Sequence, residues 1–322
     1  MGYSPSITFA SFFSGMLLCS SLVHATQSNI FPKDVYVSLK NSGEIAKFPG
    51  SVKWKGDPVM LYNSVTPDGK RLVVSSPKKK AIYVFDTQSK ELLAKVNVGK
   101  ASKGLKISPD GTEVYVANEG ESSVSVVSLS TYKELVKIPT EEMPHNIRFN
   151  NNGTLAYVTL QGGAGLGVID TKSRQVIDVI PVPGIIGPHN LDLSKNEDIA
   201  FVRDTAGSIA VLDLHNKKVK KVIKVGNGHA GVDVSVDGKF VYSGAIADDI
   251  VTVIDAHTYK KIGDIKVGFG PHGLRASKDG RWLYVVVTVD NLLVTIDTQS
   301  LKVVKKDKIS DFPFWVSVNG NP

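Results

Sequence analysis

The chain has 322 residues, of which 42 % are hydrophobic and 21 % are charged. This balance is typical of a globular protein and excludes an intrinsically disordered chain, and the length suits one large domain or two ordinary ones. The formal net charge of +7 is compatible with an acidic partner such as nucleic acid, but solubility alone explains it and is the favoured interpretation.

The first predicted element is a secretory signal peptide in residues 1–25. The run "ITFASFFSGMLLCSSLVHA" is apolar, and no Asp, Glu, Lys or Arg precedes Lys33. Val23 and Ala25 give the small-residue pattern of a cleavage site, which predicts a periplasmic or secreted protein, with an uncleaved anchor as the alternative. Cys19 is the single cysteine, so a mature chain of residues 26–322 has no disulfides and no thiolate ligands. No later segment is apolar and long enough to span a membrane.

A repeat of 42 or 43 residues occupies the rest of the chain. Apolar runs that end in Asp or Ser and a polar turn recur at this spacing, and turns of the S-x-D-G type recur every 41 to 44 residues. The first set ends at Asp86, Ser128, Asp170, Asp213, Asp255 and Asp297, and the second contains Asp68, Asp110, Asn152, Asn196, Asp237 and Asp279. Two motifs in register over six units indicate a repeat architecture.

Each repeat contains four strand signals separated by turn residues. In residues 99–140 these are "GLKIS", "EVYVAN", "SVSVVSL" and "ELVKIP". Four short antiparallel strands in about 40–45 residues are the signature of a β-propeller blade.

Six such units extend from about Gly56 to Ser310. The remaining strand signals are "PFWVSVNG" at the C-terminal end and "DVYVSLKNSGEIAKFPGSVKWKG" at the N-terminal end. We expect the first to be the innermost strand of a seventh blade and the second to supply its three outer strands, because closing the ring removes open sheet edges. The predicted fold is therefore an all-β, seven-bladed β-propeller, with residues 26–322 as one domain.

The strand sequences "EVYVANEG" (113–120), "LAYVTLQG" (155–162) and "WLYVVVT" (282–288) resemble the YVTN-repeat family of β-propellers. The "SPDG" turns and "IDT" strand ends are similar to that family as well. The resemblance covers residues 33–322 and implies membership of a superfamily that includes haem d1 proteins, nitrous oxide reductase, surface-layer proteins and a DNA-binding protein. It is specific for the fold, and function does not follow from it.

One polar position recurs four residues before each turn, flanked by apolar neighbours. It is occupied by Ser64, Lys106, Arg148, Asp192, Asp233 and Arg275, with Ser317 as the expected seventh. Strand alternation predicts that these side chains face the central channel. We take the five charged residues, together with Lys103, as candidates for binding a cofactor or an anionic ligand. The alternative is a self-neutralising, water-filled channel.

A second position, at the entrance to the innermost strands, is rich in histidine. It contains His145, His189 and His272, and His229 lies one place before the equivalent Ala230. We predict that these four histidines are metal ligands at the channel mouth. Because the mature chain offers no thiolates, the site would contain histidine ligands only; copper, zinc, iron and haem iron are compatible with it, and copper or haem is our prediction. The other two histidines, His215 and His257, fall in turns that we expect at the outer rim.

Two further interpretations of the histidines stay open. Nδ1 of each imidazole could bond the backbone of the neighbouring blade, so that the residue is structural and was copied with the repeat. A histidine could also act as a general acid or base. The string "GPHGL" (270–274) is similar to strings of streptogramin lyases, which need an acidic partner and magnesium; Glu119, Asp204 and Asp248 are the candidate acids.

The sequence thus predicts an exported binding protein with a small ligand or cofactor at the channel mouth. The first alternative is a lyase or oxidoreductase that uses the same mouth. The second is a scaffold for a protein partner or DNA. The basic cluster "PKKK" (77–80) is compatible with nucleic acid, but no stacking aromatic residues are interleaved with it, which disfavours that partner. Zinc-protease, phosphate-loop, serine-hydrolase and haem-attachment motifs do not occur in the chain.

Overall fold

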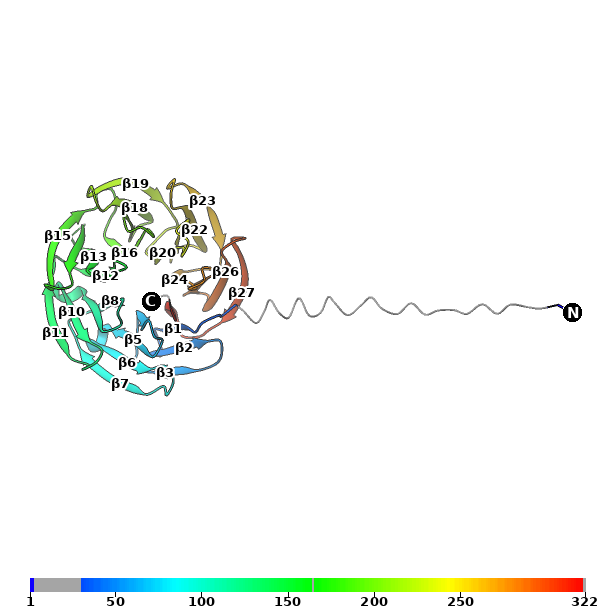
Figure 1. Ribbon diagram of the computed structural model, residues 1–322, viewed down its shortest axis with the longest axis horizontal. Helices are drawn as coiled ribbons and strands as arrows, with labels where there is room; N and C mark the ends of the chain where they lie inside the picture. Colours follow the sequence, from blue (N-terminus) through cyan, green and yellow to red (C-terminus); the bar gives the residue numbers. More distant parts are fainter. Residues whose placement is uncertain (3–29, 164, 321–322) are drawn as a thin grey trace. The chain divides into compact units, whose positions relative to one another are not determined.

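The computed structural model describes residues 1–2, 30–163 and 165–320, and these contain 28 strands in seven four-stranded antiparallel sheets. The sheets are arranged as blades around a common centre (Figure 1). Lys33–Pro322 forms one compact unit, and the predicted all-β, seven-bladed propeller is confirmed. Nearly all of the predicted signal peptide lies outside the described residues.

Six blades are continuous in sequence, and in each the strands run from the centre outward in chain order (Figure 1). The first three blades contain β4 (Asn63–Val65), β5 (Arg71–Ser76), β6 (Ala81–Asp86) and β7 (Leu92–Asn97); β8 (Ser102–Ile107), β9 (Glu113–Asn118), β10 (Ser123–Ser128) and β11 (Glu134–Pro139); and β12 (Pro144–Phe149), β13 (Leu155–Leu160), β14 (Gly165–Asp170) and β15 (Gln175–Pro181). The next three contain β16 (Pro188–Leu193), β17 (Ile199–Asp204), β18 (Ser208–Asp213) and β19 (Lys218–Lys224); β20 (Val232–Val234), β21 (Phe240–Ser243), β22 (Ile250–Asp255) and β23 (Lys261–Lys266); and β24 (Pro271–Ala276), β25 (Trp282–Val287), β26 (Leu292–Asp297) and β27 (Lys302–Lys308). Two 3-10 turns, η1 (Pro77–Lys79) and η2 (Glu119–Glu121), connect strands in the first two blades.

The seventh blade joins the two ends of the compact unit. Its order is β28 (Pro313–Val318), β1 (Val35–Leu39), β2 (Glu44–Phe48) and β3 (Lys53–Lys55). β28 is innermost and pairs with β1 in the register Val35–Val318 and Val37–Val316. The closing blade therefore has the composition that the sequence predicts.

The two repeated motifs form the turns at one end of the blades. In the S-x-D-G turn after β8, the Ser108 hydroxyl donates to Asp110, whose carboxylate accepts from the Thr112 amide, and Gly111 has a φ of 76°. In the turn after β6, the Asp86 carboxylate accepts the amides of two following residues. These side chains satisfy turn amides locally, so each repeat fixes its own strand register.

Apolar residues between neighbouring blades form the core. Leu105 and Ile107 of β8 pack in one buried cluster with Val114 and Val116 of β9 and with Tyr62 of the preceding blade. Each large apolar side chain buried in this way contributes on the order of 1.5–3 kcal/mol. The intervening polar residues of the innermost strands are thereby directed to the channel.

Within the described part of the chain, no helix has the length and hydropathy needed to cross a membrane.

Candidate functional site

Three of the four predicted ligand histidines occupy the same place in their blades. His145, His189 and His272 are each the second residue of an innermost strand, directly after a proline. His229 precedes the short strand β20. The four rings come from four consecutive blades and lie at the end of the channel opposite the S-x-D-G turns.

The rings form a continuous arc. Their centroids are 3.8 Å apart between His145 and His189, 4.7 Å between His189 and His229, and 5.2 Å between His229 and His272. Phe314 of the closing blade extends the arc, with its centroid 4.2 Å from that of His272. Tilted and edge-on rings from five of the seven blades thus line the mouth of the channel.

Backbone contacts fix the orientation of the buried histidines. Nδ1 of His145 lies 3.1 Å from the carbonyl oxygen of His189, and Nδ1 of His272 lies 2.8 Å from that of Phe314. A carbonyl oxygen only accepts, so Nδ1 carries the proton and Nε2 presents its lone pair. The interpretation that the histidines link neighbouring blades is therefore supported, and the same contacts leave Nε2 available as a ligand.

The histidines are held neutral. Burial lowers the pKa of His145 and His189 well below the usual value, and it lowers the pKa of His272 to about 3. Burial also lowers the pKa of His229, and the neighbouring positive charges of Arg203 and Lys103 lower it further. Neutral imidazole is the form that binds metal ions.

Three of the histidines converge. His189, His229 and His272 each offer one nitrogen, and these atoms all lie within 4.8 Å of one another. Nε2 of His189 and Nε2 of His272 are buried without a hydrogen-bond partner. Unpaired buried polar atoms are uncommon and indicate a missing ligand or water. His145 contacts this cluster by stacking on His189.

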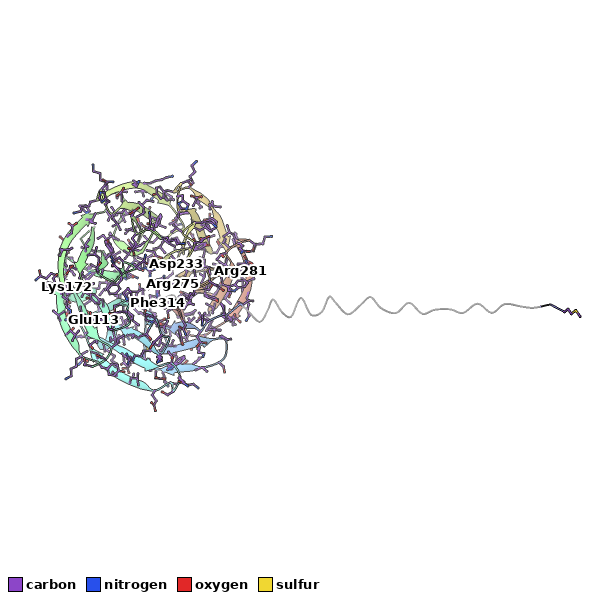
Figure 2. The ribbon with its side chains drawn as sticks, in the orientation of Figure 1. Glu113, Lys172, Asp233, Arg275, Arg281 and Phe314 are labelled. Atoms are coloured by element: carbon purple, nitrogen blue, oxygen red, sulfur yellow. The ribbon has the colours of Figure 1, made fainter. Side chains whose placement is uncertain are left out.

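The charged candidates are divided between the two ends of the channel. Lys103 lies at the histidine end, where its Nζ is 3.5 Å from a carboxylate oxygen of Glu119. That oxygen is 4.0 Å from Nε2 of His145. Lys106, Arg148, Asp192, Asp233 and Arg275 line a separate depression at the opposite end. Figure 2 shows Asp233 and Arg275 near the centre of the ring of blades and Arg281 toward its edge. The structure therefore does not bring all six candidates together.

Of the three candidate acids, Glu119 alone contacts the arc. Asp204 binds Arg203 and accepts the amides of Gly207 and Ser208. Asp248 accepts the amide of Asn227. Both carboxylates therefore stabilise loops rather than face the histidines.

Two residues that the sequence did not single out position the arc. Oε1 of Gln161 accepts a hydrogen bond from Nδ1 of His189, at 2.8 Å. Arg203 donates to the carbonyl oxygens of Gly226 and Gly228, at 2.8 and 2.6 Å, and so holds the loop that leads to His229. Each occurs in one blade, so the repeat gives no signal for it; a charged residue inside the apolar strand "IAFVRD" is the one available indication for Arg203.

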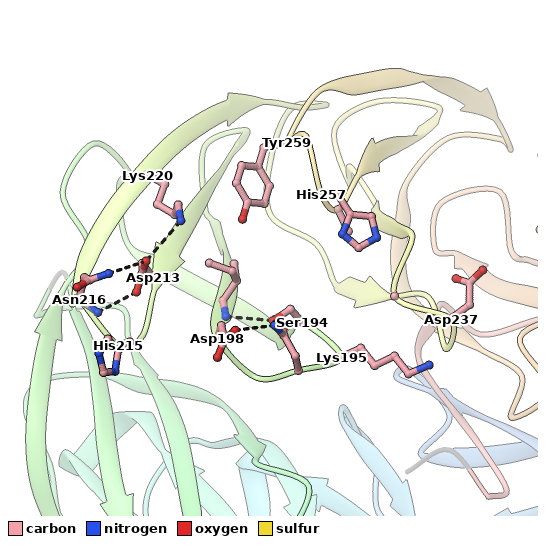
Figure 3. Close-up of a pocket in the computed structure, with 14 residues that line it drawn as sticks. Ser194, Lys195, Asp198, Asp213, His215, Asn216, Lys220, Asp237, His257 and Tyr259 are labelled. Atoms are coloured by element: carbon pink, nitrogen blue, oxygen red, sulfur yellow. Dashed lines mark hydrogen bonds and ion pairs between the residues drawn. The ribbon is translucent and has the colours of Figure 1, made fainter.

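A groove of about 790 Å³ lies at the outer rim, between the blades of β16–β19 and β20–β23. Figure 3 shows His215 and His257 on opposite sides of it, while Asp213 is bonded to Asn216 and Lys220. Both histidines are exposed, as expected for turns at the rim. The groove does not bring them together, so it does not form a second histidine cluster.

Fold and site together define a seven-bladed propeller with a histidine-lined mouth. The family model for the cytochrome D1 heme domain matches residues 150–266 and 195–312. The chain belongs to the cytochrome D1 heme domain family. No curated protein sequence matches it.

Solved structures share the fold at low sequence identity. Hydrazine synthase of Kuenenia stuttgartiensis is 19 % identical, with a TM-score of 0.74 over 83 % of this chain and 92 % of that one. A functionally unknown protein of Desulfotomaculum acetoxidans DSM 771 is 16 % identical, with a TM-score of 0.76 over 90 % of this chain and 100 % of that one. The dihydro-heme d1 dehydrogenase NirN, in complex with DHE, is 16 % identical, with a TM-score of 0.68 over 89 % of this chain and 75 % of that one.

Proposed function

We propose that this protein binds one transition-metal ion at the channel mouth through His189, His229 and His272. The observation that carries the proposal is the convergence of three imidazole nitrogens within 4.8 Å, two of them buried and without a partner. A set of neutral imidazoles without thiolates favours Cu²⁺ over the other divalent first-row ions. The ion would supply a Lewis-acidic or redox-active centre.

The surroundings of the three histidines support this role. The carbonyl oxygen of Phe314 orients His272, and Gln161 orients His189. Metal-ligating histidines are commonly oriented by such a bond at their second nitrogen, which also raises the basicity of the ligand. The ring of His145 packs against that of His189, with an angle of 31° between the ring planes.

A haem-type cofactor is the second candidate, and the family favours it. The residues fit in part: His229 is the one member of the cluster that is not buried, so it is the imidazole that a macrocycle reaches. Apolar side chains are exposed on the loops around the mouth, at Met143, Ile186, Phe269 and Val289. Lys103 would pair with a carboxylate substituent. His272 is fully buried, which favours a bare ion for the complete set.

We also propose export to the periplasm or outside the cell, on the basis of the predicted signal peptide. A catalytic role as a lyase or oxidoreductase would use the same mouth, with Glu119 as the nearest acid. A scaffold for a protein partner or DNA would not need the histidines at all. The substitutions below separate these alternatives.

The test compares wild-type protein with His189→Ala/His272→Ala, His229→Ala and the rim control His257→Ala. Each is titrated with Cu²⁺ and, separately, with haem, and is followed by metal analysis, visible absorption and thermal melting. We expect wild type and His257→Ala to bind one equivalent of Cu²⁺ and to melt at higher temperature, since a ligand at 100 times its Kd stabilises by about 2.7 kcal/mol. The double variant and His229→Ala should bind at least about tenfold more weakly.

The two cofactors give different patterns. If the ligand is a bare ion, both the double variant and His229→Ala bind it more weakly. If the ligand is a macrocycle, His229→Ala loses the haem absorption band and the double variant keeps it. Equal copper binding by wild type and the double variant would refute the metal proposal. DNA binding that decreases with salt and survives all the substitutions would favour the scaffold.

A further inference from the structure

The end of the channel opposite the histidines opens into a depression of about 600 Å³. We call it the turn-side funnel. Its lining includes the charged residues of the innermost strands: Lys106, Arg148, Asp192, Asp233 and Arg275. At its inner end lies a cavity of about 20 Å³, also lined by Lys106, Arg148 and Arg275. A space of this size holds about one water molecule or one ligand atom.

The two arginines are already paired. Nη1 of Arg275 donates to Asp233 at 2.6 Å. Nε of Arg148 lies 2.7 Å from an oxygen of Asp192, and its Nη2 lies 3.8 Å from Asp233. Two carboxylates therefore face two guanidinium groups, and the pairs compensate one another.

Lys106 is the exception. It is 8 % exposed, and neither a hydrogen bond nor an ion pair joins its ammonium group to any residue in 30–163 or 165–320. An unpaired buried cation is costly, and a hydrocarbon side chain of similar length would fill the same space without that cost. Burial, together with the charges of Arg148 and Arg275, holds the pKa of Lys106 well below its usual range.

A second unpaired group lines the same inner cavity. The hydroxyl of Ser64 is buried and makes no hydrogen bond within the described chain. The ammonium group of Lys106 and the hydroxyl of Ser64 are thus two donors without an acceptor, beside two guanidinium groups that are already paired. Oxygen atoms of an anion are the acceptors that such a set recognises.

We propose that the turn-side funnel binds a small oxyanion, a carboxylate or an inorganic oxyanion, through Lys106 and Ser64, with Arg148 and Arg275 beside it. The inner cavity takes one oxygen of the anion, and the rest of the ligand occupies the funnel. The bound anion supplies the negatively charged partner that the ammonium group of Lys106 lacks.

This site is separate from the histidine mouth. Between the two ends, side-chain amides link neighbouring blades: Asn146 donates to Asn190, Asn190 donates to the carbonyl oxygen of Ala230 at 3.0 Å, and Asn63 donates to that of Trp315 at 3.2 Å. Together with Tyr62 these residues bound the inner cavity. A ligand in the funnel therefore contacts none of the four histidines, and the two proposals fail or hold independently.

The test measures thermal melting and titration calorimetry in chloride, and then in acetate, succinate, phosphate, sulfate and nitrate at matched ionic strength. The variants are Lys106→Met, Ser64→Ala and the control Lys195→Met, which removes an exposed lysine from the rim of the same funnel. We expect at least one oxyanion to raise the Tm of wild type and of Lys195→Met. Lys106→Met should bind it at least tenfold more weakly and Ser64→Ala severalfold more weakly. The identity of the effective anions distinguishes carboxylates from inorganic oxyanions.

Stability in chloride gives an independent readout. Lys106→Met should melt at or above the wild-type temperature, because it removes an unpaired buried charge. The anion response should persist in His189→Ala/His272→Ala. The proposal is overturned if no oxyanion shifts the wild-type Tm beyond chloride, or if Lys106→Met and Ser64→Ala respond as wild type does. If Lys106→Met does not fold, the anion responses of wild type and Ser64→Ala still support or overturn the oxyanion proposal.

Discussion

Arg203, in β17, has no exposed surface and serves as a fixed point for the loop that carries His229. Besides the carbonyls of Gly226 and Gly228, it donates to the hydroxyl of Ser243 at 3.0 Å and to the carboxylate of Asp204 at 3.1 Å. The guanidinium group has five donors in a rigid plane, so one side chain satisfies several buried acceptors at once. The position of His229 therefore depends on a residue in the preceding blade.

We expect Arg203→Met to lower the free energy of unfolding by about 3–5 kcal/mol, because it removes the ion-pair partner of Asp204 and leaves buried carbonyl groups without a donor. The matched control is Arg281→Met, which removes a partly exposed ion pair with Asp297 and should cost about 0–1 kcal/mol. Urea denaturation of the metal-free proteins measures both values. Equal losses in the two variants would show that the buried bonds of Arg203 contribute little.

For individual residues, the sequence predicted which side chains point toward the channel, but not what they bind there. Strand alternation and the repeat spacing placed Lys106 and Arg148 in one ring and His189 and His272 in another. The separation of Lys103 from Lys106 follows from their positions at opposite ends of β8. Pairing choices, such as Arg275 with Asp233 and none for Lys106, depend on distances across blades that no local pattern encodes.

Neighbouring innermost strands approach closely where one of them has a glycine. A Cβ atom at Gly104, in β8, would lie 2.5 Å from the carbonyl oxygen of His145 and 2.8 Å from Cα of Asn146. At Gly273, in β24, it would lie 2.8 Å from Cα of Trp315. Both obstacles are backbone atoms of the adjacent blade, which do not move aside readily. These glycines let the innermost strands converge and bring the histidines within reach of one another.

Gly104→Ala should therefore destabilise the protein by about 1–3 kcal/mol through overpacking. It should also weaken metal binding if the displaced β12 carries the stacked His145 away from His189. Gly263→Ala, in β23, is the control, since a Cβ atom there meets nothing within 4 Å, and its effect should stay within about 0.5 kcal/mol. Chemical denaturation and copper titration of the two variants provide the comparison. A Gly104→Ala protein as stable as Gly263→Ala would contradict the packing argument.

The strands and their turns were largely predictable because each turn is stabilised by residues inside its own repeat. Ser108 and Asp110 fix the turn after β8 without help from other blades. The late start of β20, after the loop that carries His229, was not predictable in the same way. It depends on Gly231, whose amide donates to the carbonyl oxygen of His272 in the next blade.

For the whole propeller, closure of the ring depends on one pairing between distant segments. β28 pairs with β1, and the Asn319 amide donates to the carbonyl oxygen of Asp34 at 2.9 Å. β28 also supplies the carbonyl oxygen that orients His272. Closure and the histidine mouth are therefore linked through Phe314. The repeat count predicted this closure, because six complete units left one strand signal at the C-terminal end and three at the N-terminal end.

A circular permutant tests the closure. It joins Gly320 to Lys33 through a short linker and opens the chain between β3 and β4, so that the seventh blade becomes continuous in sequence. We expect it to fold and to melt within about 5 °C of wild type, which corresponds to a change of one or two kcal/mol. Deletion of residues 313–322 is the contrasting variant, and it should lose the cooperative melt because β1 is left as an open edge. A deletion variant that melts like wild type would show that the ring does not need β28.

The pairing of Val35 with Val318 also sets the order in which the protein acquires its structure. In six blades every strand pairing lies within one repeat, so the sheet of each can form soon after its residues are synthesised. The seventh needs segments from opposite ends of the chain, and contacts of such large sequence separation form slowly. Until β28 arrives, β1 has no inner partner and presents an edge at which another chain can add. The slowest folding step and the period of greatest exposure to aggregation should therefore coincide, and both should shorten in the circular permutant.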